Sequence, residues 1–354
     1  MPSLTKEFGF AGIVTVICLV VAALYGLRTG GVSQALSYFL IAAILGVMEL
    51  SLSFDNAVVN ATVLRNMSEV WQRRFLTWGI LIAVFGMRFL FPIVIVAVVA
   101  GLGFGEVINL AFTNPPAYAH HLEEAHIPIS AFGGAFLMLV FLKYLIDPDK
   151  DTHWLAPIER RLSKLGRLDT IQVFITGVLL LLLVHFAVPS AEKFSALLAG
   201  VIGILTYVLV DALGGLFDAD NLAADAAKAG AISFLYLEVL DASFSLDGVI
   251  GAFAITQDIV VIAAGLTIGA VFVRSITLML VHRGTLQAYR YLEHGAHYGI
   301  GALAIIMLLS MNPNVHIPEV VTGLIGVGFI VLSIWSSLRY NRLNAHAEQP
   351  ALKD

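Results

Sequence analysis

The sequence predicts an all-α polytopic membrane protein with about ten transmembrane helices and an inverted internal repeat. Of the 354 residues, 59% are hydrophobic and only 13% are charged, whereas charged residues make up about a quarter of a typical soluble domain. Long apolar runs recur along the chain, and two distant segments repeat one pattern of acidic and hydroxyl side chains. We therefore expect residues 1–354 to form a single transmembrane domain.

Composition and motifs also exclude several classes of function. The formal net charge of -5 at pH 7 argues against a nucleic-acid-binding protein, which needs a basic surface. The single cysteine, Cys18, excludes an internal disulfide. Neither the His-Glu-x-x-His motif of zinc proteases nor the Gly-x-x-x-x-Gly-Lys-Ser/Thr phosphate loop occurs. We predict that the chain is not an enzyme and that any transport draws on ion gradients.

Ten apolar segments are the candidate membrane spans, because a spanning helix needs about 20 mostly apolar residues. The first follows Lys6 and is too long for the apolar part of a signal peptide, so it is expected to remain as a helix. The predicted spans are 8–27, 34–64, 75–100, 130–146, 170–188, 194–217, 231–256, 258–281, 296–311 and 319–338.

The basic residues predict the orientation of these spans. Of the 20 Lys and Arg residues, 16 fall on the side of the N-terminus and only Arg28 and Lys193 on the opposite side. Since cytoplasmic loops carry the excess of positive charge, both termini are expected in the cytoplasm. The remaining two, Arg88 and Arg274, lie inside predicted helices.

Two predicted loops have a distinctive composition. Residues 101–129, assigned outside, contain acidic and histidine side chains without any Lys or Arg, so they either gather cations or form a solvated acidic loop. These side chains are Glu106, His120, His121, Glu123, Glu124 and His126. Residues 148–169, assigned inside, mix apolar and basic residues, which predicts a short amphipathic helix at the anionic cytoplasmic leaflet.

The internal repeat is carried by two polar motifs in apolar surroundings. Residues 49–56 read Glu-Leu-Ser-Leu-Ser-Phe-Asp-Asn, and residues 241–248 read Asp-Ala-Ser-Phe-Ser-Leu-Asp-Gly. In the helix that follows each motif, an arginine (Arg88 or Arg274) comes nine residues after a glycine. The two motif helices lie five spans apart and therefore run in opposite directions, as in transporters that bind substrate near the bilayer midplane.

The repeat divides the chain into predicted units. We expect one half at 34–146 and the other at 231–311. Residues 147–217 are then a linker and helix pair, and residues 319–338 a terminal helix.

The acidic side chains inside the spans need compensation. A carboxylate at a helix centre costs about 2.5–3.5 kcal/mol on insertion scales. Five acids stand against two arginines, which leaves three formal negative charges to balance. The acids are Glu49, Asp55, Glu238, Asp241 and Asp247. Protonation of the acids, a bound cation, or exchange between the two would balance these charges. The alternative is a network of acids and arginines that is purely structural. The symmetry of the repeat favours a pathway for cations or protons.

Helical geometry separates the acids of each motif. Glu49, Ser53 and Asn56 fall on one stripe, and Asp55 lies about 120° away. Either the acids reach a shared site from two angles, or the helices unwind near residues 55–56 and 247–248. Carboxylate, hydroxyl and freed carbonyl oxygens would suit Mg²⁺, Ca²⁺ or Mn²⁺.

These same residues resemble the motifs of the TerC family, integral membrane proteins named for tellurium resistance. The resemblance covers roughly residues 34–340 and includes Arg88, Arg274 and the two acidic motifs. Its motif residues are Glu49, Asp55-Asn56, Asp241, Phe244-Ser245-Leu246-Asp247 and Ile255-Thr256-Gln257-Asp258. Gly248 stands where the family usually has Ser, and residues 170–217 look like an expanded linker, which indicates a divergent branch.

The resemblance implies divalent metal transport, chiefly Mn²⁺ export across a bacterial inner membrane. The oxygen donors leave Ca²⁺ or Mg²⁺ as alternative ions, and the unbalanced acids make protons the candidate counter-ions. Carried over by residue, the resemblance implies metal ligands at Glu49, Asp55, Asp241 and Asp247, assistance from Asn56 and Ser245, and charge balance by Arg88 and Arg274. The polar positions in the two motif helices add Ser53 and Glu238 as further candidate ligands. The alternative hypothesis is a membrane scaffold that binds metal and delivers it to partner proteins, or supports tellurite or metal stress resistance, without net transport.

Overall fold

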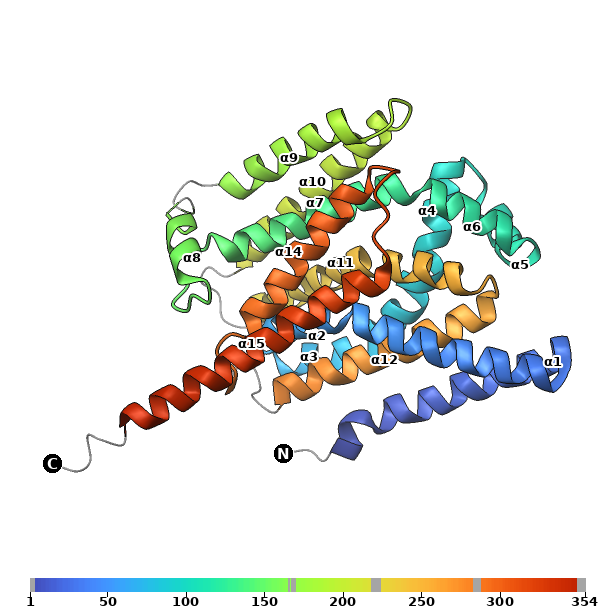
Figure 1. The fold of residues 1–354 in the computed structure, drawn as a ribbon, viewed down its shortest axis with the longest axis horizontal. Coiled ribbons are helices and arrows are strands. Elements are labelled where there is room, and N and C mark those ends of the chain that lie inside the picture. Colours follow the sequence, from blue (N-terminus) through green and yellow to red (C-terminus); the bar gives the residue numbers. More distant parts are fainter. Residues whose placement is uncertain (1–3, 165, 167–169, 218–223, 283–287, 349–354) are drawn as a thin grey trace.

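The computed structural model describes residues 4–164, 166, 170–217, 224–282 and 288–348. The chain is 86% helical, and the described residues contain no strand, which confirms the all-α prediction. Figure 1 shows the arrangement of the helices. In chain order the elements are α1 Leu4–Leu52, α2 Phe54–Leu64, α3 Glu69–Arg74, η1 Phe75–Gly79, η2 Ile82–Leu90, α4 Phe91–Ala100, α5 Phe104–Thr113, α6 Pro115–Glu124, α7 His126–Leu145, α8 Ala156–Leu162, α9 Ile171–Ala187, α10 Lys193–Phe217, α11 Ala224–Ile255, α12 Ile259–His282, α14 Leu292–Ser310 and α15 Glu319–Glu348.

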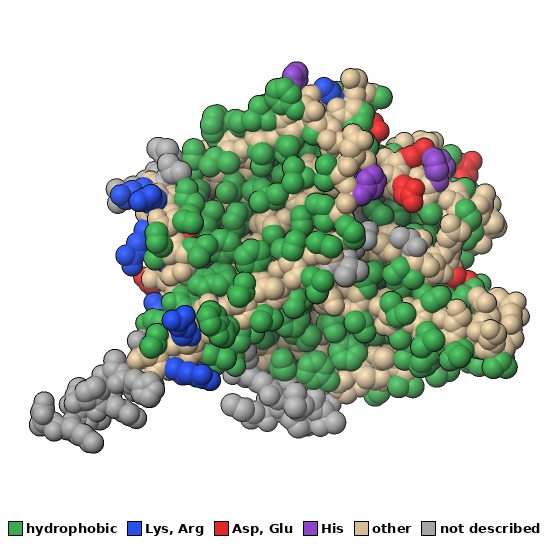
Figure 2. Space-filling model, in the orientation of Figure 1, with side chains coloured by type: hydrophobic (Ala, Val, Ile, Leu, Met, Phe, Trp, Pro, Cys, Tyr) green, Lys and Arg blue, Asp and Glu red, His purple; other side chains and the backbone are tan. Residues whose placement is uncertain are grey.

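The protein is an integral membrane protein. Among the described residues, seven helices are long and apolar enough to cross a membrane, and α9 is a shorter apolar helix. Large apolar side chains face outward, for example Phe174, Phe186 and Phe194, which are 68%, 79% and 78% exposed. Figure 2 shows hydrophobic side chains covering most of the visible face. Such a surface is stable in lipid and costly in water.

The first two predicted spans are joined by a sharp reversal. Element α1 contains non-helical residues at Gly30 and Gly31, and Gly31 has a φ of 73°, which glycine adopts without a steric penalty. The two segments of α1 fold back along each other (Figure 1), and the rings of Tyr25 and Tyr38 stack at 6.0 Å across the turn. The predicted interruption between residues 27 and 34 therefore lies where the structure places the turn.

The motif helices stay largely helical. The second span is interrupted at Ser53 (φ -104°, ψ 13°), yet its amide still donates to the carbonyl of Glu49 at 3.0 Å. The backbone of α11 is helical through residues 247–248. The helices therefore do not unwind at residues 55–56 or 247–248.

The third span departs from regular α-helical geometry. It consists of two π-helical stretches, η1 and η2, followed by α4. Arg88 lies in η2. Because π-helical turns are rare and occur frequently at functional sites, this geometry singles out the segment that carries the arginine.

Among the seven candidate spans, α7, α12 and α14 are the most buried. In the 18-residue apolar stretch of each of these helices, 67% of the residues are buried. The corresponding share is 17–28% in α1, η2–α4, α10 and α15. Helix α1 packs along α12, and α7 packs against both α10 and α14. The predicted linker pair, α9 and α10, therefore packs on the bundle through α7.

Residues 101–129 do not form the loop that we expected. They contain α5, α6 and the start of α7. Apolar residues spaced four apart in each short helix are buried, and they share one core with residues of α11 and α12. That core includes Val107, Ala111, Tyr118, Leu122, Val249 and Leu266. The acidic and histidine residues of this segment are thus held on a packed helical support.

The two ends of the bundle differ in charge. In Figure 2 the Lys and Arg side chains gather mainly at the end that carries α8 and the last part of α15, which we call the α8 end. Asp, Glu and His side chains gather at the opposite end, near α5 and α6, which we call the α6 end. This asymmetry matches the distribution of basic residues along the sequence.

Helix α8 is anchored by a buried glutamate. Glu159 is 0% exposed, and its Oε1 accepts hydrogen bonds from the amides of Trp154 and Leu155 at 3.1 and 2.7 Å and from the Tyr298 hydroxyl at 3.1 Å. Lys150 Nζ lies 2.9 Å from its Oε2. The segment therefore docks on α14 through polar contacts as well as presenting apolar residues outward, which the amphipathic pattern alone did not predict.

We expect Glu159→Gln to destabilise the protein at neutral pH, by about 3 kcal/mol, because it breaks a buried ion pair. Burial alone would raise the pKa of Glu159, but the Leu155 amide and Lys150 together hold it below its ordinary value of 4.5. A lowered pKa in the folded state stabilises the protein above the unfolded pKa, and this contribution disappears as the pH falls through the folded pKa. Thermal unfolding of both proteins from pH 7 to acidic pH should therefore show a difference that shrinks on acidification; a constant difference would contradict this role.

Candidate functional site

Buried ion pairs join each motif helix to the arginine-bearing helix that follows it. In the second half, Arg274 of α12 is 1% exposed. Its Nη2 lies 3.3 Å from Glu238 Oε1 and 3.4 Å from Asp241 Oδ2, both on α11. The ring of Phe75 covers the guanidinium, with its centroid 3.9 Å from Cζ. This arginine therefore serves two buried carboxylates.

The first half contains the matching pair. Arg88 of η2 forms an ion pair with Glu49 Oε1, and both side chains are buried. The Ser53 hydroxyl donates a hydrogen bond to the same oxygen at 3.2 Å. Arg88 Nη1 also donates to the carbonyl of Ala83 at 2.6 Å. Glu49 and Arg88 are thus fixed by contacts within their own half of the repeat.

Asn56 connects the two halves. Its Nδ2 donates a hydrogen bond to Asp241 Oδ1 at 2.8 Å, which joins α2 to α11. Arg274 holds the other oxygen of Asp241. The stripe predicted to contain Glu49, Ser53 and Asn56 therefore does face the ion-pair network.

Each half of the predicted repeat contains one acid–arginine pair at the equivalent motif position. Glu49 and Asp241 occupy equivalent motif positions, and each lies beside the arginine of its own half. Glycines at equivalent positions also mark the close helix approaches. A Cβ built on Gly79 would lie 3.0 Å from Glu238 Oε1, and one on Gly265 would meet Leu45 Cβ at 2.4 Å. The helix that follows each motif thus approaches the motif helix of the opposite half.

Glu49 is enclosed by glycines. A Cβ on Gly248 would lie 2.4 Å from Glu49 Oε2, and one on Gly269 would lie 2.4 Å from Glu49 Cγ. Real Cβ atoms essentially never show contacts under 3.0 Å. The Gly248 that departs from the TerC pattern therefore makes room for the Glu49 carboxylate.

Asp55 lies apart from this network. It is 4% exposed, and Oδ1 accepts a hydrogen bond from the Asn56 amide at 2.9 Å. Oδ2 would lie 3.0 Å and 3.1 Å from Cβ atoms built on Gly299 of α14 and Gly326 of α15. Within the described ranges no Lys, Arg or His forms an ion pair with it. A buried carboxyl group without a basic partner is costly, so this position is a strong functional candidate.

A cavity of about 650 Å³ opens near Asp55 from the α6 end. We call it the vestibule, and its lining includes Leu52, one helical turn before Asp55, and Thr322 of α15. Among the described residues, its polar lining also includes three glutamates and two histidines but no Lys or Arg. These five are Glu123, Glu124, His126, Glu192 and His316. The vestibule therefore offers a net acidic approach to the region of Asp55.

A second cavity, of about 830 Å³, reaches the network from the side of η2 and α11. Glu238 and Ala242 belong to its lining, together with Trp71 and Arg74 from the region of α3. The two acidic positions, Asp55 and Glu238, are thus approached by separate cavities.

Several buried oxygens of the site have no hydrogen-bond partner among the described residues. They are Asn56 Oδ1, Glu238 Oε2 and Ser245 Oγ, together with Asn60 Oδ1, which lies one turn after Asn56 in α2 and is also buried. Unsatisfied buried polar atoms are rare in folded proteins. Carboxylate, amide and hydroxyl oxygens are the ligands that hard divalent cations prefer, so the donor set fits such an ion.

The predicted ligands are only partly brought together. Glu49, Ser53, Asn56, Glu238, Asp241 and both arginines lie in the network, Ser245 is buried nearby on α11, and Asp55 faces α14 and α15. The side chain of Asp247 lies outside the described part of the structure. Among described His, Cys, Asp and Glu residues, the one group of three with ligand atoms within 4.8 Å is His120, His121 and Glu124. Metal binding by the four motif acids stays a prediction.

Sequence reasoning missed the surroundings of Asp55. Gly299 and Gly326, which face its carboxyl group, come from helices outside both motifs. A signal was present, because Gly295 and Gly299 form a Gly-x-x-x-Gly pattern, which is typical of closely packed membrane helices. Residues 312–318, which line much of the vestibule, carry no comparable signal.

Comparison with known proteins identifies one family. A family model described as "Protein of unknown function (DUF475)" matches residues 54–344. No curated protein and no solved structure matches the chain.

Proposed function

Since this chain belongs to the DUF475 family of membrane proteins, we propose from its own site that it is a secondary transporter of a divalent cation. Mn²⁺ is the proposed substrate, with Ca²⁺ and Mg²⁺ as the alternatives, and protons are the proposed counter-ions. The resemblance of the acidic motifs to the TerC family supports Mn²⁺ over the other two ions.

The place of Asp55 carries this proposal. Its carboxyl group is buried in a helix of the membrane domain, has no basic partner among the described residues, and lies one turn beyond the acidic vestibule. A structural acid in this position would gain stability from a nearby arginine, as Glu49 does from Arg88. An ion or proton that arrives through the vestibule supplies the missing positive charge.

The ion-pair network supports a route beyond Asp55. Asn56 adjoins Asp55 in sequence and hydrogen-bonds Asp241, so a change at Asp55 reaches the network through one residue. Glu238 lines the second cavity and is paired with Arg274. We propose that binding of a proton or cation at Asp55 is coupled to rearrangement of the ion pairs of Arg274.

The orientation follows from charge. The α8 end carries most of the basic residues, so we assign it to the cytoplasm, with both termini on that side. The proposed membrane is a bacterial inner membrane. The vestibule at the α6 end then opens on the side opposite the cytoplasm. An exporter would release its ion into this acidic vestibule.

Flux measurement tests the proposal. Purified protein in liposomes that contain a metal-sensitive dye is challenged with Mn²⁺, Ca²⁺, Mg²⁺ and Zn²⁺ at two pH values. We expect Mn²⁺ to cross faster than in protein-free liposomes, with a rate that depends on the proton gradient.

A scaffold function predicts a different result. A protein that delivers metal to partners would bind Mn²⁺ in an equilibrium assay yet leave the flux at the level of empty liposomes. That outcome would overturn transport and favour the scaffold, and absence of both binding and flux would overturn the divalent cation.

A further inference from the structure

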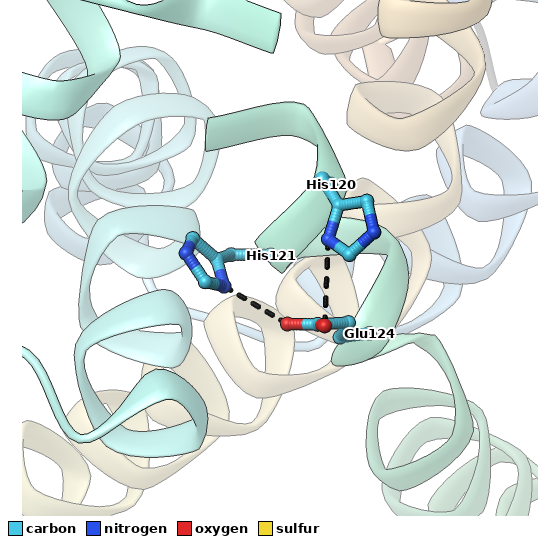
Figure 3. A group of neighbouring side chains, drawn as sticks. All are labelled: His120, His121 and Glu124. Atoms are coloured by element: carbon cyan, nitrogen blue, oxygen red, sulfur yellow. Dashed lines mark hydrogen bonds and ion pairs between the residues drawn. The ribbon is translucent and has the colours of Figure 1, made fainter. Parts of the chain in front are cut away.

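We propose that His120, His121 and Glu124 bind a divalent transition-metal ion of the Zn²⁺ type at the α6 end. This site is separate from the all-oxygen substrate site and does not depend on the proposed transport. All three residues belong to α6, and Figure 3 shows both imidazole rings next to the Glu124 carboxylate.

The three ligand atoms lie within 4.8 Å of one another. His120 Nδ1 lies 3.4 Å from Glu124 Oε1, and His121 Nδ1 lies 2.9 Å from Glu124 Oε2. Two ligand atoms about 2.0–2.1 Å from a tetrahedral Zn²⁺ are roughly 3.3 Å apart. Small side-chain rotations would therefore bring the three ligand atoms to a common ion.

Helical spacing explains why the three side chains converge. His120 and His121 precede Glu124 by four and three positions, the two spacings that place helical neighbours on one face. Each ring thus approaches a different oxygen of the same carboxylate, and the rings stand at 89° to each other. Ion pairing alone would need only one histidine, and exposed pairs of this kind contribute little stability.

The surroundings favour a cation. Glu124 also lines the vestibule, whose lining includes Glu123 and Glu192 but no Lys or Arg from the part of the chain that the structure describes. The packed core beneath α6 includes the buried Tyr118 and Leu122, so the helix is held in place before any ion binds. Three protein ligands leave a coordination position open for water.

The ligand set decides which metal class fits. Two imidazole nitrogens with one carboxylate suit Zn²⁺, Cu²⁺ or Ni²⁺ better than the hard ions Mg²⁺ and Ca²⁺. The site therefore discriminates by chemistry between this class and the ion expected near Asp55.

The test uses the full chain without a histidine tag, in lipid nanodiscs. Zn²⁺ affinity is measured by competition with a colorimetric chelator, and Cu²⁺ is used as a spectroscopic probe. The double variant His120→Ala, His121→Ala is expected to lower the Zn²⁺ affinity about 100-fold. Loss of a residue that only supports a metal ligand already lowers affinity by about 10- to 100-fold, and here two ligands are lost. Glu124→Gln is expected to weaken binding in the same direction.

His185→Ala is the matched control, because His185 is an exposed histidine in the last turn of α9, outside the group of three. Its affinity should equal that of the wild type. In the Cu²⁺ complex, electron paramagnetic resonance should show coupling to imidazole nitrogen in the wild type and lose it in the double variant. Unchanged Zn²⁺ affinity in the double variant, or nitrogen coupling that persists there, would overturn the proposal.

Discussion

Asp55→Asn is expected to abolish cation flux while leaving the protein at least as stable as the wild type. The Asn side chain has the same size, and its oxygen still accepts the hydrogen bond that the Asn56 amide gives to Asp55. The charge is lost, and with it the cost of a buried carboxylate without a basic partner, which is on the order of 2.5 kcal/mol or more at a helix centre. We expect flux to fall at least about 100-fold, since a transporter loses its substrate interaction when a charged ligand is removed.

The measurement pairs liposome flux with thermal unfolding. Asp149→Asn is the control, because Asp149 is exposed in the segment before α8, and the contact that the structure describes for it is a hydrogen bond from its amide to Asp147. Its flux and unfolding midpoint should match the wild type. Retained flux in Asp55→Asn would show that this carboxyl group is not on the ion pathway, and a large loss of stability would show that its charge is structural.

Removing Arg274 should cause a larger loss of stability than either Asp55→Asn or Glu159→Gln. Arg274→Met keeps most of the side-chain volume but leaves Glu238 and Asp241 without their shared positive charge. Breaking a buried ion pair by removing one partner costs about 3–5 kcal/mol. The loss of the guanidinium over Phe75 adds to this cost.

A second-site change separates charge from packing. Adding Glu238→Gln to Arg274→Met removes one of the two stranded charges and should recover part of the loss in unfolding midpoint. The repeat predicts the same behaviour for Arg88→Met, with recovery by Glu49→Gln. Arg339→Met, an exposed substitution on α15, should change stability by no more than about 0.5 kcal/mol. Absence of recovery in both halves would contradict a charge-balanced network.

Much of the site could be predicted from helical periodicity. The stripe that contains Glu49, Ser53 and Asn56 faces the network, and Asp55 lies off it, as the spacing indicated. The pairing of an arginine with an acid in each half also follows from the repeat. The first feature depends only on spacing along one helix, and the second only on the repetition of a motif. Both can therefore be predicted from the order of residues.

The segment 101–129 shows where local composition misleads. Its acidic and histidine residues predicted a loop, yet Val107, Ala111, Tyr118 and Leu122 bury against the bundle and make two helices. Short helices gain most of their stability from such packing, which a reading of charge alone does not detect.

The sequence by itself determined the membrane class, the long apolar helices and the two separate acidic motifs. A helix must be long and apolar to cross the lipid bilayer, and each charge inside it has a high free-energy cost, so both features are visible in the order of residues. Only the tertiary structure decided that Asp55 faces Gly299 and Gly326 instead of the arginines, and that an acidic vestibule ends one turn away. Those contacts form where helices that are far apart in the sequence pack closely against each other. Glycines allow this close packing, but the sequence does not show which helix each glycine faces.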